Sequence, residues 1–284
     1  MSKFSLVVCD LDNTIYDWYS AFLPAFYEMS RIAAEILNCD LDTLLEQLRQ
    51  VHIRHADVEH PFSLLETKIV QERAELEGQD TILTLLDEAF HAFNRIRKAN
   101  LKPFPGSIEA LRYLSDSDIK IIAYTDSKFF AAAGRVERLN IGEIFSKIYC
   151  REKGVSIIPS NYAGTKKYKI ASKIFEIPSH EMKPNPKILL EIASVENVNI
   201  DKVIYVGDSI SKDILMAKRA GCFAVWAKYG THTDREMYEK LVRISHWTQS
   251  DIDREKNYAV EAKTVVPDFV CERSLDEIKG IFLR

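Results

Sequence analysis

The sequence predicts an α/β protein whose core is a Rossmann-like parallel sheet, with an all-helical domain inserted after the first strand. The second half of the chain alternates short apolar runs, rich in β-branched residues, with segments of helical periodicity. This alternation is typical of a parallel sheet covered by helices on both faces. A similar apolar run stands at residues 6–9, but only helical patterns follow it, up to about residue 100. We therefore expect residues 1–16 and 101–284 to form the core and residues 17–100 to form a helical cap.

The cap is predicted from apolar residues that recur at helical spacing. Polar breaks at 55–61 and 77–80 separate its helices, and Pro103, Pro105 and Gly106 end the helical run. The helices expected in the cap cover residues 21–37, 41–51, 63–76 and 81–96.

The core elements follow this break. The strands expected there cover residues 119–127, 146–150, 202–209 and 222–227, and the helices cover 108–116, 129–139, 167–175, 186–196 and 212–221. The segment 229–263 begins as a helix and then becomes polar and irregular, so no role is predicted for it. Residues 265–283 return to a strand and a helix, as at the edge of a sheet.

Composition and charge argue against several classes of protein. With 46% hydrophobic residues, 28% charged residues and a net charge of -4, nothing indicates a broad surface for nucleic acid or anionic lipid. The five cysteines are scattered without a CxxC pair, which predicts reduced thiols rather than a zinc site or a disulfide framework. No apolar run approaches membrane-spanning length, and Asp10 interrupts the first run too early for a signal peptide. We expect a cytoplasmic protein with no nucleic-acid or membrane partner, and the oligomeric state stays open.

Carboxylates gather where the predicted strands end. Asp10 and Asp12 follow the first strand on the same side of an extended chain, where like charges repel. Ligands of open parallel sheets bind beyond the carboxyl ends of the strands, so side chains from several strands should meet there. Their oxygen atoms would hold a hard divalent cation such as Mg²⁺, which would offset the repulsion. The side chains expected at this edge are Asp10, Asp12, Thr14, Thr125, Asp126, Ser127, Lys183, Asp208 and Asp213.

Four short motifs at this edge, DLDNT, YTDS, KPNP and GDSISKD, resemble the four sequence motifs of the haloacid dehalogenase superfamily. They occur in order, each at a predicted strand end or in the matching loop. The inserted helices are similar to that family's all-helical cap of the first type. The resemblance covers nearly the whole chain apart from residues 229–263. It implies a magnesium-dependent phosphatase that hydrolyses a small phosphorylated metabolite through an aspartyl-phosphate intermediate.

The resemblance also implies roles in catalysis and metal binding. Asp10 would be the nucleophile and a ligand of Mg²⁺. Asp12 would be the general acid for the leaving oxygen and then the general base for water, with its backbone carbonyl on the metal. Asp208 would be the third protein ligand of the metal.

A phosphate site is implied by the same likeness. Thr125, the backbone amide of Asp126 and the ammonium of Lys183 would hold the phosphoryl oxygens. Asp213 would position Lys183 or a metal-bound water, and Thr14 would lie in the layer behind these groups. The family often has an uncharged residue at the position of Asp126. A carboxylate so near a phosphate is unfavourable unless it points away, although the backbone amide is still available.

Other readings stay open beside this one. A dehalogenase also uses an aspartate nucleophile but typically lacks the second acidic residue, so Asp12 argues against it. A phosphomutase needs the same four motifs, and a phosphonatase would need a cap lysine, for which Lys68 is a weak candidate. A non-catalytic binding protein of the same fold would usually lack a nucleophile or ligand, and none is missing here. The substrate itself is not predicted: nucleotides, sugar phosphates and short phospho-acids all remain open.

The polar break at 52–62 joins two predicted cap helices and is rich in groups that bind an anion or a ring. We expect Arg54, His55 or His60 to contact the non-phosphate end of the substrate. The alternative is a solvated connector. The spacing of the histidines matches no standard zinc pattern.

Overall fold

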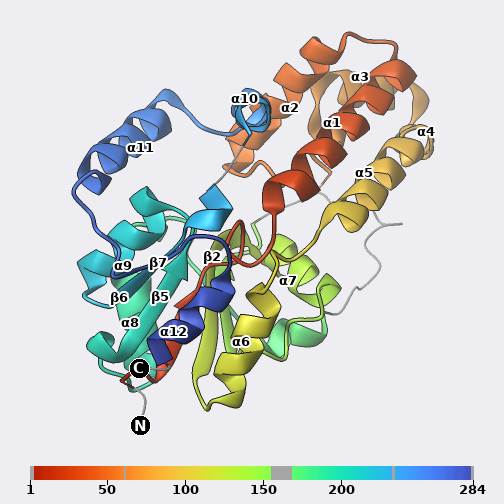
Figure 1. The fold of residues 1–284 in the computed structure, drawn as a ribbon. Coiled ribbons are helices and arrows are strands. Elements are labelled where there is room, and N and C mark those ends of the chain that lie inside the picture. The colour runs from red at the N-terminus through yellow and green to blue at the C-terminus, as the bar shows by residue number, and fades with distance from the viewer. Residues whose placement is uncertain (1–2, 61, 155–167, 232–233, 283–284) are drawn as a thin grey trace.

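Seven parallel strands form the sheet at the centre of the core (Figure 1). The computed structural model describes residues 3–60, 62–154, 168–231 and 234–282 of the chain. The strands are Leu6–Cys9 (β1), Lys120–Lys128 (β2), Lys147–Arg151 (β3), Ile174–Ile177 (β4), Val203–Gly207 (β5), Phe223–Ala227 (β6) and Phe269–Cys271 (β7). They lie in the order β4-β3-β2-β1-β5-β6-β7, and each neighbouring pair is parallel. The predicted α/β parallel-sheet core is therefore confirmed.

Helices cover both faces of this sheet (Figure 1). The core helices are Ser107–Asp116 (α6), Phe129–Arg138 (α7), Lys187–Val195 (α8), Leu215–Ala220 (α9) and Lys279–Phe282 (α12). Val7 and Cys9 of β1 pack in one apolar cluster with α6 and α7, whereas Leu6 and Val8 pack in another with α8 and α9. Because β1 is buried on both faces, its sequence is apolar at every position instead of alternating. Its neighbours β2 and β5 run parallel to it, so all three strands end at one edge.

The inserted segment is helical, as predicted (Figure 1). Its helices are Trp18–Leu37 (α1), Leu41–His55 (α2), the 3-10 turn Ser63–Glu66 (η1), Lys68–Glu77 (α3), Gln79–Leu85 (α4) and Asp87–Asn100 (α5). The first and last of these, α1 and α5, lie along one another. Asp17 caps α1 by accepting a hydrogen bond from the Ser20 amide at 2.9 Å, which explains why the helix begins there. Among the described residues, no helix is both long enough and apolar enough to cross a membrane.

One predicted helix of the core is wrong. The pattern at 167–175 predicts a helix, but Ile174–Ile177 is the edge strand β4, preceded by a 3-10 turn at Lys169–Lys173 (η2); residue 167 lies outside the described residues. An edge strand has one neighbour and an open side, so its apolar alternation is weak. Phe175 is 41% exposed and stacks on Tyr149 of β3, at 5.3 Å between ring centroids. The pairing with β3 therefore decides the conformation of this segment.

The segment to which the sequence assigns no role touches both the cap and the core. It contains Arg235–Ile244 (α10) and Gln249–Ala262 (α11). Leu241 and Ile244 of α10 belong to the apolar cluster of the cap helices, and Figure 1 shows α10 beside α2. Helix α11 packs on the turn Ile210–Ile214 (η4), which follows β5. The core range proposed from the sequence, 101–284, thus includes a helix that packs with the cap.

Candidate active site

Three carboxylates converge beyond the ends of β1 and β5. Asp10, Asp208 and Asp213 each offer one carboxylate oxygen, and these oxygens lie within 4.8 Å of one another. We call these three residues the acidic centre. Asp10 directly follows β1, and its amide donates to the Val206 carbonyl of β5 at 2.9 Å. The parallel pairing of two adjacent strands therefore brings the first and fourth motifs together.

Lys183 supplies positive charge to the acidic centre. Its Nζ lies 2.7 Å from Asp10 Oδ1 and 2.9 Å from Asp213 Oδ1, and the side chain is buried. The rings of Tyr124 and Tyr205 flank the ammonium, with their centroids at 5.2 and 5.7 Å. The Tyr205 hydroxyl also donates to Asp213 Oδ1 at 2.8 Å. Lys183 and Asp213 therefore form a buried ion pair beside the Asp10 carboxylate.

A glycine allows the Asp213 carboxylate to approach the sheet this closely. A Cβ atom added to Gly207, the last residue of β5, would collide with the Asp213 carboxyl group. On its other side, Asp213 Oδ2 accepts a hydrogen bond from the Ser209 amide at 3.0 Å. Both oxygens of Asp213 thus have donors within the protein, so this residue is suited to positioning its neighbours.

The electrostatics of the acidic centre favour a bound cation. Burial raises the pKa of Asp10, and the neighbouring Asp213 and Asp12 carboxylates raise it further, against the opposing effect of Lys183. Burial, Asp213 and Asp10 likewise raise the pKa of Asp208 well above its usual range. Burial alone would lower the pKa of Lys183, but the carboxylates of Asp10 and Asp213 hold it high, so the ammonium is charged. Three carboxylates facing one ammonium leave an excess of negative charge on oxygen donors alone, which fits a hard divalent ion such as Mg²⁺.

Asp12 is held apart from this centre by a separate set of donors. Its Oδ2 accepts hydrogen bonds from Ser127 Oγ at 2.6 Å and from Thr125 Oγ1 at 3.3 Å. Arg135 of α7 places Nη2 3.2 Å from the same oxygen and 3.1 Å from Oδ1. The two neighbouring aspartates of the first motif therefore each have a cation of their own, Lys183 for Asp10 and Arg135 for Asp12. This division reduces the repulsion that the sequence predicts between them.

The other residues predicted for the site are Thr125, Asp126 and Thr14. Thr125 is buried within β2. Asp126 Oδ1 accepts a hydrogen bond from the Lys183 amide at 3.4 Å, and burial raises the pKa of Asp126. Its carboxyl group therefore faces the backbone of the KPNP loop. Thr14 is fully buried, and its hydroxyl oxygen has no hydrogen-bond partner within the described part of the chain.

A glycine of the loop after β6 packs directly on the first motif. A Cβ atom on Gly230 would run into the carbonyl oxygen of Asn13, and Asp208 Cβ would lie 3.2 Å from it. The hydroxyl of the preceding residue, Tyr229, donates to the Thr14 carbonyl at 2.7 Å. The start of the unassigned segment 229–263 thus supports the turn that carries Asn13 and Thr14.

Sequence reasoning missed Arg135. It lies on α7 among the buried residues Ala132, Ala133 and Val136, and it is 7% exposed. A charged residue on the apolar face of an amphipathic helix is costly unless it is paired. That position was the signal available in the sequence.

The three cap residues predicted to contact the substrate gather around Glu66. His55 Nε2 lies 2.7 Å from Glu66 Oε2, and His60 Nε2 lies 2.5 Å from Oε1. The two imidazole rings stack at 3.5 Å between centroids, and Arg54 donates to the Glu66 carbonyl at 3.1 Å. We call these four residues the Glu66 cluster. Among the described residues, none of these four side chains bonds to a residue of the acidic centre, and their contact with substrate stays a prediction.

The connector after α2 is held to the core by basic side chains from three core elements. Lys128 Nζ lies 3.0 Å from the His55 carbonyl and 3.4 Å from Asp57 Oδ2. Arg135 Nη1 donates to both carboxylate oxygens of Glu59, at 2.6 and 2.8 Å. Arg151 Nη2 also lies 3.4 Å from the Ala56 carbonyl. Residues 55–59, which we call the docking loop, therefore lie against the strand ends of the core.

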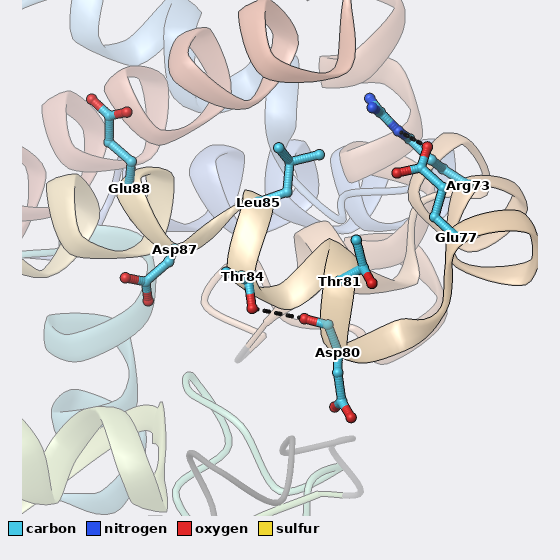
Figure 2. A pocket seen from close by; sticks show the side chains of 8 residues that line it. All are labelled: Arg73, Glu77, Asp80, Thr81, Thr84, Leu85, Asp87 and Glu88. Carbon is cyan, nitrogen blue, oxygen red and sulfur yellow. Dashed lines mark hydrogen bonds and ion pairs between the residues drawn. The ribbon is translucent and has the colours of Figure 1, made fainter.

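Two hollows lie elsewhere in the cap. One, of about 540 Å³, is lined by residues of η1, α3 and α4, among them Glu66, Val70 and Leu83. The other is a groove beside α3, α4 and α5, where Figure 2 shows Arg73 paired with Glu77 and the Thr84 hydroxyl bonded to the Asp80 carbonyl. Neither is lined by a residue of the four motifs. They lie apart from the site that the motifs form.

Comparison with known proteins decides the family. A family profile described as haloacid dehalogenase-like hydrolase matches residues 4–221. The chain belongs to this family. The predicted superfamily and its hydrolase class are thus confirmed.

Relatives of known name agree with this assignment. The chain is 29% identical over 238 residues to a glyceraldehyde 3-phosphate phosphatase of Methanopyrus kandleri, covering 81% of this chain and 86% of the relative. It is 24% identical over 236 residues to a phosphoglycolate phosphatase of Agrobacterium fabrum, covering 82% and 84%. A solved haloacid dehalogenase phosphatase from Thermococcus onnurineus superposes with a TM-score of 0.57 at 16% identity, over 98% of this chain and 97% of that one. This last likeness concerns the fold.

Proposed function

We propose that the protein is a magnesium-dependent phosphatase that hydrolyses a small phosphorylated metabolite through an aspartyl-phosphate intermediate. The observation that carries the proposal is the separation of two aspartates that lie only two positions apart in the chain. Asp10 lies in the acidic centre, 2.7 Å from Lys183 Nζ, whereas Asp12 is bound by Ser127, Thr125 and Arg135. This separation supports a division of roles in which Asp10 attacks and Asp12 transfers protons.

In the first step, a carboxylate oxygen of Asp10 attacks the phosphorus atom and the bond from phosphorus to the leaving oxygen breaks. The Asp12 carboxyl group gives its proton to that leaving oxygen. In the second step, a water oxygen attacks the phosphorus of the aspartyl phosphate while Asp12 takes a proton from the water. The bond to the Asp10 oxygen then breaks, and inorganic phosphate leaves with Asp10 restored.

The other site residues bind charge during both steps. Lys183, Thr125 and the backbone amide of Asp126 would hold the phosphoryl oxygens. Asp10, Asp208 and the Asp12 carbonyl would hold Mg²⁺, which when bound supplies positive charge to the phosphoryl oxygens. Asp213, which already accepts from Tyr205 and Ser209, would keep Lys183 in place.

We propose a compact phosphate ester as the substrate. The family and its named phosphatase relatives indicate phosphoric monoesters, and glyceraldehyde 3-phosphate and phosphoglycolate, named for two relatives, are both small. The docking loop lies against the strand ends, which supports small substrates over macromolecular ones. The five cysteines are free thiols, which supports a cytoplasmic location.

Release of inorganic phosphate from a panel of phosphorylated metabolites tests the proposal. Turnover of short phospho-acids and sugar phosphates should require Mg²⁺, stop with a chelator and return poorly with Ca²⁺, whose larger coordination sphere misplaces the reacting groups. Full activity in the chelator would overturn the metal assignment. Transfer of the phosphoryl group to a second sugar position, without phosphate release, would indicate a mutase instead.

Asp208→Asn separates metal binding from a general loss of structure. This variant should need at least about tenfold more Mg²⁺ for half-maximal turnover, since even the outer partners of a metal commonly contribute that much. It should also lose the rise in Tm that Mg²⁺ gives the native chain, because a ligand stabilises only the state that binds it. An unchanged Mg²⁺ requirement and an unchanged rise in Tm would remove Asp208 from the metal site.

A further inference from the structure

We propose that Arg135 is a positioning residue that orients the Asp12 carboxyl group, and that Glu59 of the docking loop fixes Arg135 in turn. The position of the cap would then set the geometry of the proton-transfer group. This inference rests on the proposed function, because it takes Asp12 as the general acid and base.

The guanidinium of Arg135 is bonded on every side. Its Nε donates to the Tyr16 hydroxyl at 3.0 Å, and its Nη1 donates to both oxygens of Glu59. Its Nη2 donates to Ser127 Oγ at 2.6 Å and to Asp12 Oδ2 at 3.2 Å. A guanidinium is planar and presents its N–H groups in fixed directions, so fixing one side of it fixes the other. A lysine ammonium at the same place could not hold these partners in one plane.

The other donors to Asp12 are less restrictive. Thr125 and Ser127 bind it through hydroxyl groups, which rotate about their C–O bonds. Ser127 is itself bonded to Arg135 Nη2. The rigid element in this network is therefore the arginine, and the orientation of Asp12 depends on it.

Glu59 brings the cap into the network. Its side chain is 12% exposed and lies beside Arg135, whose side chain is 8% exposed. The pair is formed only when the docking loop lies on the core, since α7 belongs to the core and Glu59 to the connector after α2. If the docking loop moves away from the core, Arg135 Nη1 loses its hydrogen bonds to Glu59. The guanidinium is then less firmly fixed, and so is the orientation of Asp12.

The readout is the sensitivity of the enzyme to its leaving group. An alkyl phosphate needs a proton on its leaving oxygen, whereas a nitrophenyl phosphate does not. A misplaced Asp12 should therefore lower kcat/KM for the alkyl ester much more than for the aryl ester. General acid catalysis commonly contributes about a hundredfold or more, so a partial misplacement should change the ratio of the two kcat/KM values by about tenfold. A merely structural defect would lower both values alike.

Arg135→Lys and Glu59→Gln test the two links of the network. Both should raise the aryl-to-alkyl ratio, Arg135→Lys by about tenfold and Glu59→Gln by about threefold, because the glutamine leaves the arginine present but more weakly held. Lys128→Met is the matched control, because Lys128 also anchors the docking loop but does not bond to Asp12. The aryl-to-alkyl ratio of this variant should stay within about twofold of the native ratio. If Arg135→Lys fails to fold, Glu59→Gln compared with Lys128→Met tests the network.

The outcomes separate this inference from the proposed function. A native chain without metal-dependent turnover of either ester would refute the phosphatase itself. Native turnover with an unchanged ratio in Arg135→Lys and Glu59→Gln would refute only the role of Arg135. An equal rise of the ratio in Lys128→Met would show that loop docking in general, and not the Glu59–Arg135 pair, acts on Asp12.

Discussion

The carboxylate pKa values shift in opposite directions in the acidic centre of the core and in the Glu66 cluster of the cap. In the core, burial and neighbouring carboxylates raise the pKa of Asp10 despite Lys183. In the cap, burial also acts against the Glu66 carboxylate, but hydrogen bonds from His55 and His60 outweigh it and lower the pKa of Glu66. The core thus holds three carboxylates beside one ammonium, Lys183, while the cap carboxylate has a histidine at each of its oxygens. Negative charge is therefore in excess in the acidic centre, whereas neighbouring donors balance it in the Glu66 cluster.

Asp10→Asn should have the largest effect on this comparison. Removing the nucleophile should lower turnover by on the order of a thousandfold or more. The variant should nevertheless match or exceed the native Tm in metal-free buffer at neutral pH. The pKa of Asp10 is higher in the folded chain than in the unfolded chain. Above the pKa of the unfolded chain, folding therefore disfavours the ionised carboxylate and loses stability. Asparagine has no ionised form, so it removes this loss. A clear fall in Tm would show that the ion pair with Lys183 outweighs the repulsion.

His52 should make the cap sensitive to acid. It is fully buried, its Nδ1 lies 2.7 Å from the Ile244 carbonyl of α10, and burial lowers its pKa to about 4. The unfolded chain binds the proton near pH 6.5, so stability is complete above that pH and is lost as the pH falls from there towards 4. The loss should reach about 3 kcal/mol.

Urea unfolding at pH 7 and pH 4.5 measures this loss. His52→Gln should flatten the difference between the two pH values, whereas the matched control His91→Gln, at a histidine whose side chain is 76% exposed on α5, should leave it unchanged. The same pH dependence in all three proteins would contradict the assignment to His52.

Glu66→Gln should destabilise the cap, in contrast to Asp10→Asn in the core. Glutamine keeps the size of the side chain but turns an amide donor towards one of two imidazole nitrogens, so a partly buried charged hydrogen bond is lost. The expected loss is about 2 kcal/mol in the free energy of unfolding. Glu77→Gln is the control, since its partner Arg73 is on the surface (Figure 2) and such pairs contribute about 0–1 kcal/mol. Equal losses in both variants would remove the distinction.

Arg54→Ala should have the smallest effect. The Arg54 side chain is 55% exposed and donates to the Glu66 backbone, so its removal should change kcat/KM by less than about twofold for an aryl phosphate and for the best metabolite alike. A tenfold loss confined to the metabolite would instead support the contact with the non-phosphate end of the substrate that the sequence suggests.

Much of the fold could be predicted because its elements are locally consistent. The apolar run at β1 and the helical periodicity of the cap identify themselves within a few residues. The strand β4 could not be predicted, since Phe175 and Glu176 are exposed and only pairing with β3 makes the segment a strand. The packing of α10 on the cap could not be predicted either. Leu241 and Ile244 indicate that α10 has an apolar face, but the sequence does not indicate which element packs against it.

For the site, too, some features could be predicted from the sequence and others depended on tertiary packing. Asp10 and Asp208 directly follow β1 and β5. Asp213 lies in η4, and Lys183 lies in the loop before α8. The parallel order of strands in such a sheet brings these positions to one edge. The sequence by itself therefore determined which residues share the edge. It could not determine which cation each aspartate would face.

Only the tertiary structure decided that Asp10 pairs with Lys183 and Asp12 with Arg135. It likewise decided that Arg54, His55 and His60 gather on Glu66, and that Glu59 bonds to Arg135 of the core. The physical reason is that pairing between charges depends on side-chain direction over a few ångströms. That direction is set by how α7 and the docking loop pack, which local periodicity does not encode.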